Sequence, residues 1–188
     1  MILVLRFIGV MNAAIWLGGA VFFTLAVAPA FFSGEITLLE THGRLHPFYP
    51  GAIAQFVLER YFRLYYVCGA IALVHQLAEW VYLGRPLRRL NLGVLIGLLF
   101  IGGAGGLWLQ PMLKELHLIK YGMTAQYTRP GTPIPDADRI QAAKSFRGWH
   151  GVSMALNLVG LAGLIFYFWR VTNPPDNLRL LGSPKFRS

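Results

Sequence analysis

The stretch LNLGVLIGLLFIGGAGGLWLQPML, residues 90 to 113, carries no charged side chain. An apolar run of about 18 residues or more, folded as a helix, is long enough to cross a hydrocarbon layer about 30 Å thick. Three further runs of this kind lie between Arg6 and Ser33, between Arg63 and Arg85, and between Arg147 and Arg170. The runs lack the alternating pattern of membrane strands, and a backbone in lipid must satisfy its own hydrogen bonds. The sequence therefore predicts an all-α fold, a four-helix transmembrane bundle.

The composition supports a membrane protein. Hydrophobic residues make up 55% of the chain, and the mean hydropathy is +0.51, which is far above a soluble average. The net charge of +9 is carried by basic residues that gather beside the predicted helix ends, where they suit lipid headgroups. We therefore expect the lipid bilayer to be the partner and expect no nucleic acid to bind.

The predicted architecture is a single membrane domain, residues 1–172, with crossings at about residues 7–32, 64–84, 91–113 and 148–169. The apolar pattern of GAIAQFVLERYF, residues 51 to 62, predicts a short surface helix before the second crossing. The tail, residues 173–188, is predicted to be irregular.

The orientation follows from the density of positive charge. Four crossings place both termini on the side that also holds RPLRRL, residues 85 to 90. The basic residues of this side are packed beside helix ends, whereas those of the other side are spread over two long connections that can translocate despite their charge. The sequence thus predicts a bacterial inner-membrane protein whose termini and tail are cytoplasmic.

Polar residues interrupt the fourth apolar run. His150, Ser153 and Asn157 are spaced i, i+3 and i+7, so they share one face of a helix. The second run carries His75 and Glu79 on one face in the same way. Counting about 1.5 Å of depth per residue from the flanking basic residues predicts three pairs, namely His75 with Asn157, His150 with Gln110, and Asn12 with Glu79. Together with Ser153, these six residues would form a polar ladder of seven residues across the bundle.

Two interpretations of the ladder remain open. Polar side chains of this kind join membrane helices through hydrogen bonds worth about 0.6 to 2 kcal/mol each. Ionisable groups near the middle of a membrane are costly, however, and mark a functional hypothesis by default. For His75 and Glu79 the sequence therefore supports a functional role as well as a structural one.

Glycines are concentrated in the third run, where they form two GxxxG patterns, Gly93 with Gly97 and Gly102 with Gly106. Small residues let helix backbones approach closely in lipid. We therefore expect the third helix to be central to helix packing.

Four histidines fall on the side opposite the termini, namely His42, His46, His117 and His150. His42 and His46 have the i, i+4 spacing of a helical ligand pair, and imidazole suits zinc, copper and haem iron. His75 lies roughly 13 Å deeper than His150, so these two cannot share one iron. Because no cysteine or paired carboxylate completes a site, we expect no cofactor, and an outer-side haem or metal site is the alternative.

Four segments carry a family resemblance: NAAIWLGGAVFFTLAVAPAFF (12–32), HPFYPGAIAQFVLERYFRLYYVCGAIAL (46–73), WLQP (108–111) and FRGWHGVSMALNL (146–158). The most specific feature is an aromatic-His-Gly pattern followed by Ser and Asn-Leu, at His150, Gly151, Ser153, Asn157 and Leu158. In these segments the chain resembles the transmembrane protein 205-like family, whose bacterial members are catalogued mainly as a domain of unknown function. The resemblance implies a four-helix integral membrane protein and no known reaction.

The sequence contains no nucleophile elbow, P-loop, GxGxxG or HExxH motif, so we do not expect an enzyme. The first functional hypothesis is a non-enzymatic membrane protein that acts by helix packing, or by association with other membrane subunits or with itself. The second is a small transporter or proton-linked carrier in which His75, Glu79 and Asn157 line a path. The third is the outer-side haem or metal protein.

Overall fold

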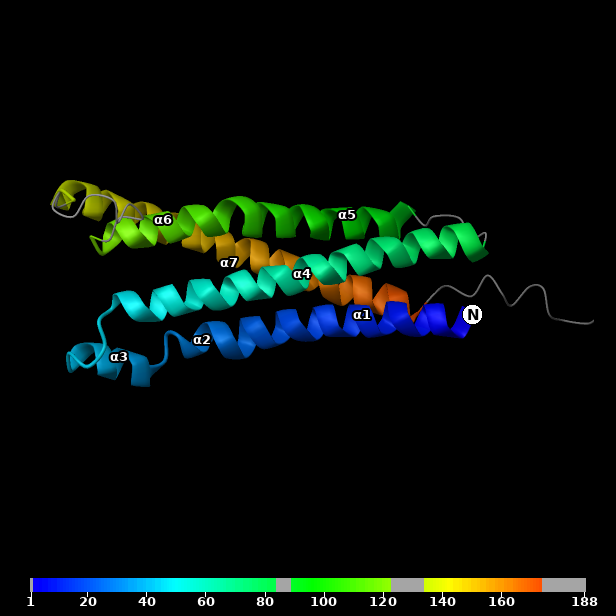
Figure 1. The fold of residues 1–188 in the computed structure, drawn as a ribbon, viewed down its shortest axis with the longest axis horizontal. Coiled ribbons are helices and arrows are strands. Elements are labelled where there is room, and N and C mark those ends of the chain that lie inside the picture. Colours follow the sequence, from blue (N-terminus) through cyan, green and yellow to red (C-terminus); the bar gives the residue numbers. More distant parts are fainter. Residues whose placement is uncertain (1, 84–88, 123–133, 174–188) are drawn as a thin grey trace, which may run out of the picture.

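The computed structural model describes residues 2–83, 89–122 and 134–173, which form a bundle of four long helical rods (Figure 1). Each rod is long and apolar enough to cross a membrane. The predicted all-α bundle is confirmed, and the described residues contain no strand. Most of the predicted irregular tail, from residue 174 on, and most of RPLRRL lie outside the described residues.

The first rod consists of α1 (Ile2–Phe22), the π-helical segment η1 (Phe23–Val27) and the short α2 (Ala28–Ala30). A separate helix, α3 (Gly34–Thr41), follows at the end of the bundle away from the N-terminus (Figure 1). Ser33 caps α3, because its hydroxyl accepts a hydrogen bond from the Ile36 N–H at 3.5 Å.

The second rod is one uninterrupted helix, α4 (Phe48–Leu83), of 36 residues. It contains residues 51–62, so the helix expected there is continuous with the second crossing, and α3 is the short helix that precedes the crossing. At about 1.5 Å per residue α4 is about 54 Å long, well beyond the roughly 30 Å of a hydrocarbon layer. The second rod therefore extends outside a membrane.

The third rod consists of α5 (Arg89–Gly103), the π-helical segment η2 (Ala104–Leu109) and α6 (Gln110–Lys120). Residues 113–120 continue the third crossing as a helix. The fourth rod is α7 (Asp136–Thr172), an unbroken helix of 37 residues.

A proline follows each π-helical segment, Pro29 after η1 and Pro111 after η2. Proline lacks an N–H, and its ring crowds the carbonyl group four residues earlier in a helix. The wider turns of the π-helical segments accommodate this crowding without ending the rod. Two irregular segments thus interrupt otherwise regular helices, and both lie in the half of the bundle away from the N-terminus.

The rods are arranged around a central tryptophan. α1 packs against α4 and α7, and the third rod packs against the same two helices, so α4 and α7 stand at opposite corners of the bundle. Trp16 of α1 is 1% exposed, and its ring meets Tyr65 of α4 edge-on at 4.9 Å between centroids. Tyr167 of α7 approaches the same ring to 6.0 Å. This core closes the middle of the bundle.

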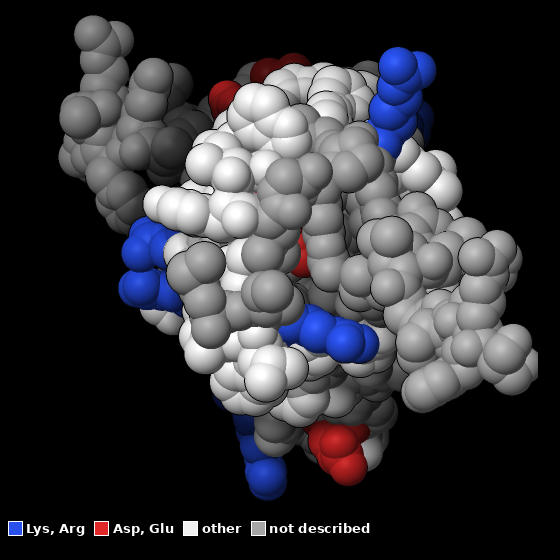
Figure 2. Space-filling model, turned by 90° about the vertical axis from the view of Figure 1, so that its right-hand side faces the viewer, with Lys and Arg blue, Asp and Glu red and all other residues white. Residues whose placement is uncertain are grey.

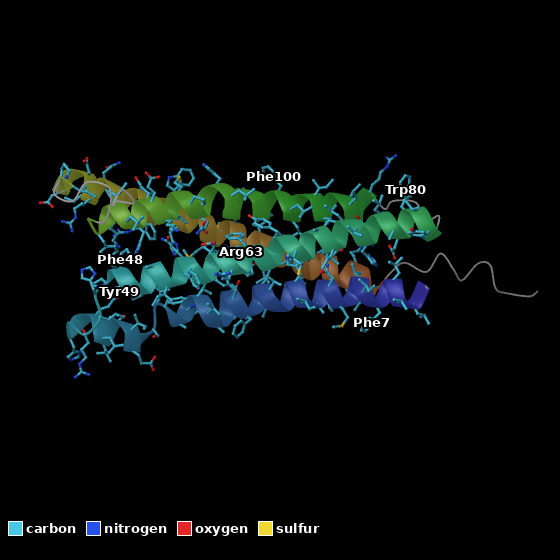
Figure 3. The ribbon with its side chains drawn as sticks, viewed as in Figure 1. Phe7, Phe48, Tyr49, Arg63, Trp80 and Phe100 are labelled. Atoms are coloured by element: carbon cyan, nitrogen blue, oxygen red, sulfur yellow. The ribbon has the colours of Figure 1, made fainter. Side chains whose placement is uncertain are left out.

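The outer surface of the rods is apolar, as contact with lipid requires. Seen from the end that holds the N-terminus, Lys and Arg side chains stand at several points of the perimeter and also near the middle of the face (Figure 2). Phe7 and Phe100 point out of the bundle on opposite sides (Figure 3), and they are 64% and 75% exposed. Large apolar surfaces of this kind mark membrane contact.

Candidate binding cavity

The polar ladder is built differently from the predicted one. His75 of α4 places its Nε2 2.9 Å from the carbonyl oxygen of Leu5 in α1. Asn157 of α7 donates its side-chain N–H to Thr24 Oγ1 in η1, at 2.8 Å. His75 and Asn157 therefore do not form the predicted pair, because α4 and α7 stand at opposite corners and each bonds to the first rod between them.

The expected pairing of Asn12 with Glu79 is also replaced. Asn12 donates its side-chain N–H to the carbonyl oxygen of Cys68 in α4, at 2.9 Å. Glu79 is half-buried and interacts electrostatically with Tyr167 of α7. Asn12 thus joins α1 to α4 through the backbone of α4.

A cavity of about 460 Å³ lies between the rods, in the half of the bundle away from the N-terminus. This volume falls in the range of about 300–1,000 Å³ that small-molecule sites occupy. All four rods and α3 contribute to its wall, which is mainly apolar and aromatic. Four of the seven ladder residues line it, namely Gln110, His150, Ser153 and Asn157.

The described wall of the cavity does not include His75, Glu79 or Asn12. Toward the terminal end the cavity reaches Tyr65, which is packed on the central Trp16. The aromatic core therefore separates the cavity from the half of the bundle that holds His75. Sequence reasoning predicted the polar residues of α7 as site candidates, but it did not predict this cavity.

Both π-helical segments border the cavity. Phe23 comes from η1, and Gly105 and Leu109 come from η2. Thr24 of η1 also receives the hydrogen bond from Asn157 of the cavity wall. π-helical turns occur frequently at functional sites. Their presence on two facing rods therefore supports a functional site in this half of the bundle. The signal in the sequence is the pair of prolines, Pro29 and Pro111, each two residues after a π-helical segment.

Stacked rings line the end of the cavity near α3. His117 of α6 is 4% exposed; its Nε2 lies 3.1 Å from the carbonyl oxygen of Phe48, and its ring stacks on the Phe48 ring at 5.2 Å. Phe146 of α7 lies 5.7 Å from His117 and stacks on His150 at the same centroid distance. Two of the predicted metal-ligand histidines are thus separated by a phenyl ring.

The described residues contain no group of three or more His, Cys, Asp and Glu placed to hold a metal ion. His42 is exposed, and its Nδ1 lies 2.7 Å from the Leu38 carbonyl oxygen of its own helix. His46 meets the ring of Tyr121 at 6.0 Å. The structure therefore does not bring His42 and His46 together with His117 and His150 around one point.

The two predicted GxxxG patterns differ in their surroundings. A Cβ at Gly102 would overlap the ring of Tyr65, and a Cβ at Gly106 would overlap Tyr66. Gly93 and Gly97 have nothing within 4 Å of such a Cβ. Side chains of α4 therefore contact the second pattern, whereas the first pattern has open space around it in the described residues.

The cavity straddles the predicted membrane boundary. Arg63, near the middle of α4 (Figure 3), marks this boundary together with Lys114 and Arg147 on the neighbouring rods. Asn157 lies ten residues deeper than Arg147 along α7, whereas Lys120 lies six residues beyond Lys114 along α6. The cavity wall contains both Asn157 and Lys120, which lie on opposite sides of the predicted boundary.

Residues 11–121 match a family described as a domain of unknown function (DUF4149). The chain belongs to the DUF4149 family. The match covers the first three rods except for the beginning of α1, and these rods supply most of the cavity wall. In this DUF4149 chain α3, inside the matched residues, and α7, beyond them, also contribute to the wall. No curated protein and no solved structure shows a significant match.

Proposed function

We propose that this DUF4149 protein is a non-enzymatic integral membrane protein that binds a small, largely apolar molecule between its rods. The observation that supports this best is the cavity of about 460 Å³. Protein interiors are packed closely, with few voids larger than a water molecule. A space of this size, with an apolar wall and a few polar groups, is typical of ligand sites.

The proposal includes no chemical step. Catalysis by a side-chain nucleophile needs a base within hydrogen-bonding distance, and no hydrogen bond joins Ser153 to His150 in the described wall. Binding is also favoured over a proton-linked carrier, because the aromatic core around Trp16 lies between the cavity and His75. Association with other membrane subunits is compatible with ligand binding and forms no part of the proposal.

We also propose a membrane location and a family relationship for this protein. Dense basic charge beside the terminal helix ends supports a bacterial inner-membrane protein with cytoplasmic termini, so the half of the bundle that holds the cavity faces the other side. The likeness to transmembrane protein 205-like proteins is supported by the segments that carry it. Residues 46–73 supply Gly51 and Ala54 to the cavity wall, and residues 146–158 supply Ser153 and Asn157.

Filling the cavity tests the binding role. Ser153 lines the cavity, whereas Ala155, two residues along α7, is exposed and is not part of the wall. Wild-type protein, Ser153→Phe and Ala155→Phe are purified in mild detergent, and the small molecules that copurify are identified by mass spectrometry. We expect wild type and Ala155→Phe to retain a molecule that Ser153→Phe loses. Identical extracts from three folded proteins would contradict the proposal.

A further inference from the structure

The charges on the cavity wall restrict the ligand. Among the described residues of the wall, Glu40 of α3 is the one carboxylate, Lys120 of α6 is the one ammonium group, and none is an arginine. The Lys120 Nζ lies over the rings of Tyr121 and Phe146, at 4.8 and 5.7 Å from their centroids. A buried phosphate or carboxylate needs paired cations, so this wall favours an uncharged ligand.

Aromatic rings shape the space itself. The cavity wall includes Phe23 of η1 and Tyr61 of α4, whose rings are stacked at 4.6 Å with an interplanar angle of 14°. Phe62 and Tyr65 of α4 and Phe146 of α7 add further rings. Because aromatic side chains pack best in offset or edge-to-face arrangements, a wall of this kind suits a planar ring compound.

One uncharged polar edge runs along the α7 side of the cavity. Ser153 and Asn157 are one turn apart on this helix, about 6 Å along its axis, and both line the cavity. The Asn157 N–H is donated to Thr24, which fixes the orientation of the amide. Ser153 makes no side-chain hydrogen bond within the described part of the chain, so its hydroxyl is available to a ligand in an otherwise apolar space.

We propose that the cavity takes an uncharged planar ring compound that bears carbonyl or hydroxyl groups, of the chemical class of the lipid-soluble quinones. This inference rests on the proposed binding function and adds the class of ligand. The rings of Tyr61 and Phe62 contact the flat faces or edges of the compound. Ser153 donates its hydroxyl proton to a ligand oxygen, and Asn157 forms the polar end of the same edge. The apolar remainder of the ligand occupies the rest of the wall.

Calorimetric titration of the detergent-solubilised full chain tests this class of ligand. The probes are 2-methyl-1,4-naphthoquinone, which is neutral and planar, and oleate, which is anionic and has no ring; protein-free micelles give the background for each. We expect the naphthoquinone to bind at one site per chain, at least about tenfold more tightly than oleate. A neutral hydrogen bond contributes about two- to tenfold in affinity, so Ser153→Ala should weaken naphthoquinone binding by that factor.

Leu158→Ala is the matched control, because Leu158 is on the same helix and is 59% exposed; it should leave both affinities unchanged. Oleate binding as tight as, or tighter than, naphthoquinone binding would overturn the ligand class and leave the binding function standing. Binding of neither probe would overturn the ligand class as well. In that case the comparison of copurified molecules between wild type and Ser153→Phe shows separately whether the binding function fails.

Discussion

The imidazole of His75 occupies the space beside Gly9, where any other residue would place its Cβ. The His75 Nε2 lies 2.9 Å from the carbonyl oxygen of Leu5, one helical turn before Gly9. The second buried histidine repeats this arrangement, because the His117 ring lies against Gly51 and its Nε2 is bonded to the Phe48 carbonyl oxygen at 3.1 Å. Glycine thus lets an imidazole reach the backbone of a neighbouring helix and join the two rods.

The first prediction concerns the contact between Gly9 and His75. Gly9→Ala should lower the free energy of unfolding by about 1–3 kcal/mol, because the added methyl group forces the imidazole out of its place. Reversible unfolding in mixed micelles, monitored by circular dichroism, measures the effect. Gly18→Ala on the same helix has open space around it and should be neutral or slightly stabilising. If Gly9→Ala costs as much in a His75→Ala background, the overlap is not the cause.

The second prediction concerns the hydrogen bond between Asn157 and Thr24, which measures 2.8 Å. Asn157→Leu and Thr24→Val should each destabilise the protein, and the double variant should cost less than the sum of the two. Interhelical hydrogen bonds in membranes give coupling energies of about 0.6 kcal/mol and at most about 1.7 kcal/mol. A double-mutant cycle on unfolding free energies measures this coupling. Additive costs would mean that the bond contributes nothing to stability.

The sequence was sufficient to predict the fold, because a helix that crosses lipid needs a long apolar run. The four apolar runs correspond to the four rods. It was insufficient for the ladder because depth and helical face do not specify which helices are neighbours. His75 and Asn157 are near the same predicted depth, yet their helices stand at opposite corners. The observed hydrogen bonds go to the backbone carbonyl oxygens of Leu5 and Cys68. Every residue has such a carbonyl group, so the sequence does not indicate which one is the acceptor.

The cavity was harder to predict, because a void has no residue type of its own. The polar residues His150, Ser153 and Asn157 were recognised as unusual, and they do line it. The sequence did not predict the two π-helical segments on facing rods, although a proline follows each segment. Proline inside an apolar run signals an irregular turn, but it does not indicate toward which side that turn opens.

The third prediction separates the two GxxxG patterns of the third rod. Gly106→Ala should destabilise the bundle by about 1–3 kcal/mol, because its Cβ would overlap Tyr66 and Phe62 of α4. Gly97→Ala should leave stability nearly unchanged, since nothing lies within 4 Å of its Cβ. The same micelle unfolding assay compares the two variants. Equal losses would show that Gly97 packs against a second chain or another partner.

The last prediction concerns Cys68, the one cysteine of the chain. Cys68 is 2% exposed in the core around Trp16. A thiol reagent can therefore reach its sulfur only after the bundle opens. An opening free energy of about 3 kcal/mol would slow the reaction ~100-fold. N-ethylmaleimide should therefore modify Cys68 at least ~100-fold more slowly than it modifies Thr41→Cys in a Cys68→Ala background, because Thr41 is exposed at the end of α3.

Mass spectrometry follows both reactions, and comparable rates in the folded state would show that the core admits small molecules from outside. That result would extend the accessible space beyond the cavity wall at Tyr65 toward His75, and it would revive the carrier hypothesis that the closed core disfavours.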